Sequence, residues 1–370
     1  MKFPFWYLFD GLLPLSAFLF WMPFSPQVSV FPALLWLAGQ LLAAPQYQRW
    51  ALWPCLCLGL LGVRLWWFNA GPGPASFADA ALFFVSLLAS SSVAMHRWSY
   101  LFKGLLVGFI PLALLLGPKP WNPNPFIGSN QAAYLMGFML IVSLFWALQL
   151  SQQLWLRLIA SVVTALSFVM IWQTGSRAAL VASIVSIFFV VVREIKIRFN
   201  TLKPILWLLS GAAFVYFIRW QFFSSSPSLP GFKAGSDVGR IIASQCYAQL
   251  PFSGNNRFFY GVGFDRMKEF CDISFQNSAL QHAHNFYIQI WSATGLFGLF
   301  SMLLLLVMLI SCWQTAYRMM PSYLRCVGQA SLVYVLLQCA FDLSVLHWPI
   351  TIIFTGIFLA IPLSYSVRAT

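Results

Sequence analysis

The chain alternates between long apolar runs and short polar gaps. A helix that crosses a bilayer needs roughly 20 consecutive, mostly apolar residues. Runs of about that length occur at 5–24, 28–44, 50–68, 76–95, 99–117, 129–149, 154–173, 176–192, 203–222, 284–311, 323–340 and 344–363. This pattern predicts an all-α integral membrane protein with about twelve transmembrane helices.

One gap, at 223–283, is long, polar and rich in Ser, Gly and Pro. It holds four of the eight acidic residues of the chain and five Lys or Arg residues. Long loops in compact proteins are usually functional or disordered. The predicted organisation is therefore nine helices in 1–222, one long loop in 223–283, and three helices in 284–370.

The composition supports a membrane protein and gives its orientation. The chain is 60% hydrophobic and 8% charged, whereas soluble domains carry about 25% charged residues. A net charge of +13 could indicate nucleic-acid binding, but most Lys and Arg residues lie in alternate gaps, on the side of Lys2. By the positive-inside rule this side is cytoplasmic. We expect both termini in the cytoplasm, the 223–283 loop outside, and no nucleic-acid partner.

Two arginines and a histidine fall on the outer side of this topology. Arg177 lies at the outer end of the eighth run, Arg240 lies in the long loop, and His284 begins the tenth run. Guanidinium groups bind phosphate oxygens bidentately and stay charged, so Arg177 and Arg240 could stabilise a pyrophosphate leaving group. Taken singly, Arg177 could instead be an interfacial anchor and Arg240 a solvated loop charge.

A neutral imidazole at His284 could take the proton from an attacking hydroxyl. If a helix begins at His284, its dipole disfavours added positive charge and keeps the imidazole neutral. The alternative is a capping or packing histidine. His282 lies two residues earlier, a spacing that points it elsewhere on a helix, so it is a weaker candidate.

No metal or other cofactor is expected. Mg²⁺ and Mn²⁺ select oxygen ligands, and a metal-dependent transferase would need paired carboxylates facing outward. Asp10, Asp79 and Asp342 are isolated near helix ends, and the acidic residues of the long loop lack Asp-x-Asp spacing.

Four short motifs resemble the O-antigen ligase and O-antigen polymerase superfamily of bacterial membrane glycosyltransferases. The stretch at 284–298 matches that family's histidine signature, with Gly295 and Gly298 at the expected spacing. The other three are PFIGSNQAAYL at 125–135, TGSRAAL at 174–180, and SDVGR at 236–240 followed by GVGF at 261–264. One departure is Ala178, where many members have Gly.

The resemblance implies a GT-C-like membrane fold in the bacterial inner membrane and a metal-independent, inverting transferase that faces the periplasm. It implies that His284 is the base or orients the acceptor, and that Arg177 and Arg240 bind the pyrophosphate of a polyprenyl-linked glycan donor. The preferred function is an O-antigen ligase acting on lipid A-core in lipopolysaccharide biosynthesis. A polymerase that extends lipid-linked repeats is the close alternative, and a membrane transporter is an alternative of another class.

Weaker candidates for substrate binding are Arg64, Lys119, Asn130 and Asn285. The predicted outer loop has only two cysteines, Cys246 and Cys271. Because the periplasm is oxidising, paired thiols there tend to form disulfides. We expect a Cys246–Cys271 bond, with two unpaired cysteines as the alternative.

Overall fold

The structure is a computed structural model, and it describes most of the chain. The described residues are 9–21, 26–43, 74–115, 129–149, 153–194, 235–264, 266–271, 274–275, 278–279, 282–316, 320–342 and 349–366. The helices of the first part are α2 (Leu12–Trp21), α3 (Pro26–Ala43), α5 (Pro74–Ser91), α6 (Met95–Leu115), α7 (Ser129–Leu148), α8 (Leu154–Gln173) and α9 (Arg177–Glu194).

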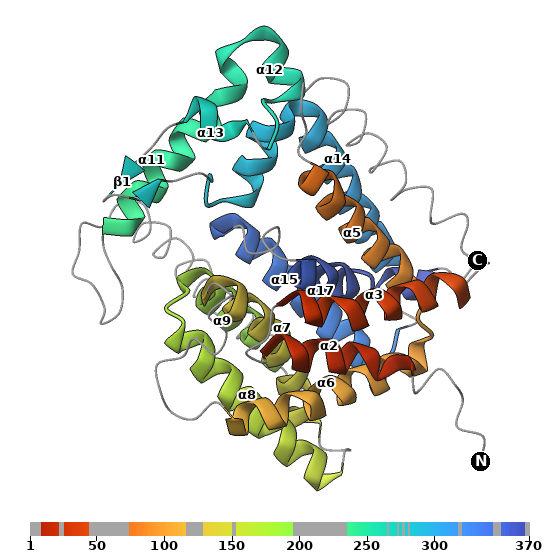
Figure 1. The fold of residues 1–370 in the computed structure, drawn as a ribbon. Coiled ribbons are helices and arrows are strands. Elements are labelled where there is room, and N and C mark those ends of the chain that lie inside the picture. The colour runs from red at the N-terminus through yellow and green to blue at the C-terminus, as the bar shows by residue number, and fades with distance from the viewer. Residues whose placement is uncertain are drawn as a thin grey trace, which may run out of the picture.

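The second part contains several short elements and two long helices (Figure 1). In order these elements are α11 (Gly235–Gln249), η1 (Leu250–Ser253), α12 (Asn255–Tyr260), α13 (Met267–Phe270), β1 (Ser274–Phe275), β2 (Ser278–Ala279), α14 (Phe286–Ala316), α15 (Ser322–Phe341), α17 (Pro349–Leu359) and α18 (Leu363–Ser366). Strands β1 and β2 form a small antiparallel pair.

Most of each predicted apolar run that the structure describes is helical. The run at 154–173, for example, is α8. The runs at 50–68 and 203–222 lie outside the described residues. Among the described residues, four helices are long and apolar enough to cross a membrane: α7, α8, α14 and α15. The chain is therefore a largely α-helical protein with the long apolar helices of a membrane-embedded protein.

Helices α7 and α15 form the centre of the bundle and run antiparallel. Tyr134 stacks on Tyr334 with ring centroids 5.7 Å apart, and at the other end Phe145 contacts Tyr323 at 6.5 Å. Residues later in α7 therefore contact residues earlier in α15. Helix α7 is almost wholly buried, whereas α8 presents large exposed apolar side chains such as Trp155 and Leu158. This is the arrangement of a helix bundle covered by lipid.

A buried ion pair ties together α2, α3 and α6. Arg97 Nε donates to Asp10 Oδ2 at 2.8 Å, and Arg97 Nη2 also binds this carboxylate. Trp36 Nε1 donates to Asp10 Oδ1 at 3.1 Å, and Arg97 Nη1 donates to Gln40 at 3.2 Å. Asp10 and Arg97 are 4% and 7% exposed. The sequence did not predict this pair, because Asp10 and Arg97 are 87 residues apart.

Helix α14 is broken at Gly295, which has φ 61° and ψ −154°. The break separates a short helix at 286–294 from a long one at 296–316. At 1.5 Å per residue the long part measures about 31 Å, close to the thickness of a bilayer core. The predicted span at 284–311 corresponds to α14, which begins at Phe286 and is long and apolar enough to cross a membrane. The break at Gly295 within it was not predicted.

Residues 235–294, called here the 235–294 segment, form a second small core. It includes Ala243, Tyr247, Val262, Met267 and Ala293. Figure 1 shows α11, α12 and α13 together on one side of the molecule, apart from the crossed helices of the first part. Where the sequence predicted a loop, the structure has short packed helices.

Candidate active site

Asn130 and Arg177 lie at the same end of the helix bundle. The Tyr334 hydroxyl donates to the carbonyls of Ala133 and Tyr134 at 3.3 and 3.0 Å, so the start of α7, with Asn130, lies level with the end of α15. Arg177 is the first residue of α9.

Helix α9 runs antiparallel to α15. The hydroxyl of Ser186 bonds to the carbonyl of Ala330, and Ser183 lies beside Tyr334. The N-terminal end of α9, with Arg177, therefore lies beside the C-terminal end of α15. We call this end of the bundle, where α7 and α9 begin and α15 ends, the site end.

His284 also lies at the site end. Its neighbour Asn285 donates from Nδ2 to the carbonyl of Ala340 at 2.6 Å, and Tyr287 donates from its hydroxyl to the carbonyl of Leu336 at 3.0 Å. The Oδ1 of Asn285 accepts the backbone N–H of Ile288 at 3.1 Å. Asn285 is therefore the N-cap of α14. Its amide is used in fixing the helix, which favours a structural role over substrate binding.

Because α14 begins at Phe286, the prediction of a helix beginning at His284 is wrong by two residues. His284 lies just outside the helix, with φ 51°, and it is the one non-glycine with positive φ among the described residues. The segment from His282 to Asn285 is not helical. The helical-spacing argument against His282 therefore does not apply.

Arg240 lies on α11, the helix that contacts the histidine segment. The Ser244 hydroxyl donates to the carbonyl of Ala283 at 2.7 Å, directly beside His284. Further along α11, the carbonyl of Tyr247 accepts from Ser292. Residues later in α11 thus contact residues later in the stretch 283–292, so the two segments run parallel. Positions 240 and 244 share a helix face, so Arg240 lies one turn before Ser244, on the face of α11 that contacts the histidine segment.

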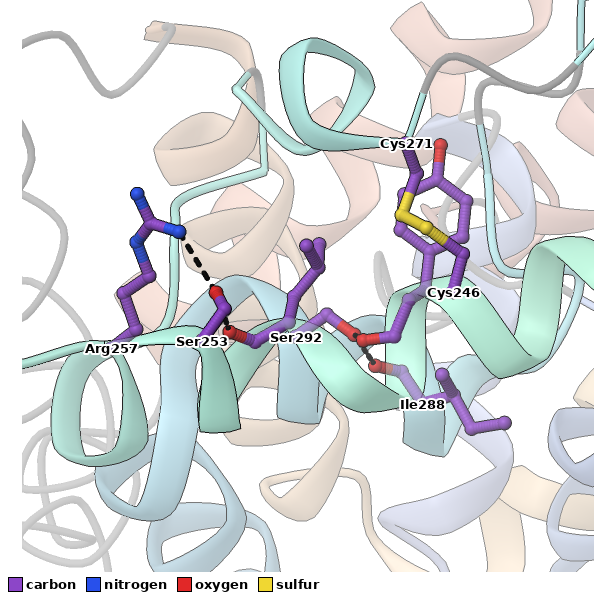
Figure 2. The surroundings of a disulfide bond; sticks show 8 residues. Cys246, Ser253, Arg257, Cys271, Ile288 and Ser292 are labelled. Carbon is purple, nitrogen blue, oxygen red and sulfur yellow. Dashed lines mark hydrogen bonds between the residues drawn. A yellow bond between two sulfur atoms is a disulfide. The ribbon is translucent and has the colours of Figure 1, made fainter. Parts of the chain in front are cut away.

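The predicted disulfide between Cys246 and Cys271 is present. The two Cα atoms are 6.1 Å apart, and the bond ties α11 to the end of α13 (Figure 2). In the same view, Arg257 donates to the Ser253 hydroxyl at 2.8 Å. The bond therefore fixes the helix that carries Arg240, two turns from that arginine.

The two glycine motifs form one structural unit. The backbone N–H groups of Val262 and Gly263 donate to the carbonyls of Ser292 and Ala293, at 2.9 and 2.8 Å, where the break in α14 leaves those carbonyls accessible. A Cβ on Gly295 would lie 2.6 Å from the backbone nitrogen of Gly261. The sequence marked these glycines separately. Their contact across the break of α14 was not predicted.

An apolar cavity of about 240 Å³ begins beside the histidine segment. Phe286 and Tyr287 line one end, and Leu309 lines it further along α14. Helices α5, α15 and α17 supply the other walls, and Asp79 is the one charged residue among the described residues that line it. Nothing in the sequence indicated this cavity, because its walls come from helices far apart in the chain.

Two weaker candidates, Arg64 and Lys119, lie outside the described residues. No protein-family model and no curated protein matches the chain. Its function is therefore inferred from the motifs and from the placement of their side chains.

Proposed function

We propose that the protein transfers a glycan from a polyprenyl-pyrophosphate carrier to an acceptor hydroxyl at the periplasmic face of the inner membrane, without a metal and with inversion. The observation that carries this proposal is the apolar cavity whose lining begins at Phe286, two residues after His284, and follows α14. A carrier of this class has a charged head and a long apolar chain, and the two parts need adjoining sites of opposite character.

The charged head is assigned to Arg177 and Arg240. Arg177 begins α9 at the site end, and Arg240 lies on α11, the helix that contacts the histidine segment through Ser244. Guanidinium forks suit pyrophosphate oxygens because they bind two at once. When the bond from the anomeric carbon to the pyrophosphate oxygen breaks, the electron pair stays on the pyrophosphate, and fixed positive charge stabilises it.

The acceptor is assigned to the side of His284. An acceptor hydroxyl oxygen attacks the anomeric carbon from the face opposite the pyrophosphate, which inverts that centre. The hydroxyl proton passes to an imidazole nitrogen of His284. Bond formation, bond cleavage and proton transfer are then balanced without another reactant.

The apolar chain of the carrier is assigned to the cavity. Leu306 lines it, while the next residue on α14, Val307, is 58% exposed and points away. Leu306→Trp fills part of the cavity, so it should raise the KM for the carrier roughly tenfold, as expected when a few CH₂ groups lose their burial. Val307→Trp is the matched control and should leave KM unchanged. Equal KM values for both variants and the parent would remove the cavity from the proposal.

The acceptor class decides between the two glycosyl-transfer reactions. The protein is reconstituted in proteoliposomes with a carrier-linked glycan, with and without lipid A-core, in the presence of a chelator. Glycosylated lipid A-core identifies the ligase that we prefer, and longer carrier-linked chains without added acceptor identify a polymerase. Movement of the donor across the vesicle membrane with no transfer product would contradict the proposal and favour a transporter.

A further inference from the structure

Aromatic side chains cluster on η1, α12 and the short part of α14. Phe252 contacts Phe258 and Trp291 with ring centroids 6.0 and 5.7 Å apart, and Phe258 contacts Trp291 at 5.6 Å. Phe252 is nevertheless 70% exposed, and Phe259 is 48% exposed. Soluble surfaces rarely carry large exposed apolar patches without a partner.

This aromatic cluster continues onto the long part of α14. Tyr260, the last residue of α12, stacks on Phe297 with centroids 5.2 Å apart and rings 16° from parallel. Phe297 belongs to the first turn after the break at Gly295. From there the exposed face of α14 is an apolar stripe at helical spacing, formed by Phe297, Phe300, Leu303, Val307 and Ile310.

The break in α14 places the cluster relative to the bilayer. The long part of α14 has the length of the hydrocarbon core, and placing it across that core puts Gly295 at one boundary. Because Tyr260 stacks on Phe297, α12 lies at the same boundary. Aromatic residues are enriched at this depth, where a ring can meet both acyl chains and headgroups.

An arginine of α12 packs on an aromatic ring of the same segment. The guanidinium of Arg257 lies 4.3 Å from the ring centroid of Phe270, with its Nη1 bonded to Ser253. Arginine near the headgroups is favourable because its apolar stem stays in the interface while its charge remains hydrated.

From this continuity we propose that η1 and α12 form an interfacial anchor, with Phe252 and Phe259 inserted among the lipids of the nearer leaflet. The partner is the lipid surface itself. The anchor adds a second point of membrane contact to the 235–294 segment, independent of the chemistry proposed above.

Photo-crosslinking in nanodiscs tests the anchor. The photoreactive amino acid p-benzoylphenylalanine replaces Phe252 or Phe259 in the full chain, in discs of phosphatidylethanolamine and phosphatidylglycerol with deuterated acyl chains. Position 300, on the exposed stripe of α14, is the positive control. Position 269, where Glu269 is exposed on α13, is the negative control. The readout is the mass of peptide–lipid adducts after irradiation.

Deuterated lipid adducts at positions 252 and 259, with yields like that at 300 and none at 269, are the expected result. Absence of adducts at 252 and 259, while 300 reacts, would overturn the anchor. Adducts to a second copy of the chain at these positions would also overturn it, because the rings would then belong to an interface between copies.

Discussion

His284 is held in a left-handed backbone conformation that few side chains adopt. Such conformations are uncommon outside glycine and are retained where the surroundings fix them, often at functional sites. Here the neighbouring Ala283 is fixed on both sides, since its N–H donates to Gln289 at 3.0 Å and its carbonyl accepts from Ser244. The side chain of His284 is therefore presented by a rigid segment between the bundle and α11.

Two substitutions of His284 distinguish the role of its imidazole in proton transfer from the role of its backbone conformation in the fold. Asn tolerates positive φ better than Ala, so His284→Asn keeps the conformation but has no basic nitrogen. We expect both His284→Asn and His284→Ala to lower transfer by roughly 10²-fold or more, while only the Ala variant also lowers the Tm. Initial rates and thermal unfolding in detergent measure this. Parent-like rates for the Asn variant would mean that position 284 serves the fold and not proton transfer.

Substitution by lysine tests the assignment of Arg177 and Arg240, because it keeps the positive charge and removes the bidentate guanidinium group. Arg177→Lys and Arg240→Lys should each raise KM for the carrier and lower kcat, because lysine cannot bind two phosphate oxygens in one plane. Arg257→Lys, at an arginine bonded to Ser253 on the same segment, is the control and should behave like the parent. If the lysine variants at 177 and 240 match the parent in both constants, these residues are anchors or surface charges.

At the scale of elements, the break in α14 and the glycine loop stabilise one another. Gly295→Ala adds a Cβ 2.6 Å from the nitrogen of Gly261 and forces alanine to a φ of 61°. We expect a loss of about 1–3 kcal/mol in the free energy of unfolding and a loss of transfer activity, because His284 precedes this short helix.

Gly254 offers the control for this change. It has extended backbone, and its added Cβ would meet only the Arg257 side chain at 3.6 Å or more. Gly254→Ala should therefore unfold at the parent temperature. A Gly295→Ala protein as stable as Gly254→Ala would show that the break does not need glycine.

The ion pair of Asp10 and Arg97 should be costly to break from one side. Asp10→Asn or Arg97→Gln leaves a buried charge without its partner, and each should lower stability by about 3–5 kcal/mol. The double variant Asp10→Asn, Arg97→Gln should lose clearly less than the sum of the two. Unfolding in mixed micelles measures all three. Additive losses would indicate that the two charges are not coupled.

The sequence predicted those features that depend on a local run of residues. Apolar runs of bilayer length define α7, α8 and α15 because burial in lipid needs only composition and length. The break at Gly295 was not predicted, since hydropathy stays high on both sides of it. Helix α11 was also missed, although Ala243, Tyr247 and Leu250 repeat at helical spacing within a polar stretch.

The features of the fold and of the site that the sequence did not predict depend on contacts between residues far apart in the chain. Asp10 and Arg97 are 87 residues apart, and neither has a sequence pattern that identifies the other. The motifs indicated Arg177, Arg240 and His284 as candidates, but only the packing of α9, α11 and α15 gives their placement. The disulfide could be predicted because the loop holds two cysteines and no other choice of partner.

At the scale of the whole molecule, the candidate site lies where the 235–294 segment meets the helix bundle. Asn285 attaches the histidine segment to α15, and Ser244 attaches it to α11. The position of Arg240 relative to Arg177 therefore depends on how firmly the 235–294 segment is held. The disulfide, the glycine unit and the proposed lipid anchor all act on that segment.

The disulfide should be formed in the purified protein. Alkylation without reductant should leave Cys246 and Cys271 unmodified by mass spectrometry, and alkylation after reduction should modify both. The loop that it closes has a sequence separation of 25, for which chain entropy predicts a contribution of about 3–4 kcal/mol. Cys246→Ser should lower the Tm accordingly. Two freely alkylated thiols in the unreduced protein would contradict the bond and the outer placement of the segment.

The buried pair of Asp10 and Arg97 also has a consequence for biosynthesis. At about 5–20 residues per second, the ribosome makes Arg97 roughly 4–17 s after Asp10. During this interval the first helix holds a carboxylate without its cation, at a position that becomes buried in the finished protein. A lone acidic group is poorly tolerated in the bilayer, so the first helix has to remain near the translocon or the lipid surface. We therefore expect the first helix to reach its final position only when α6 arrives, so that early insertion of this protein involves several helices together.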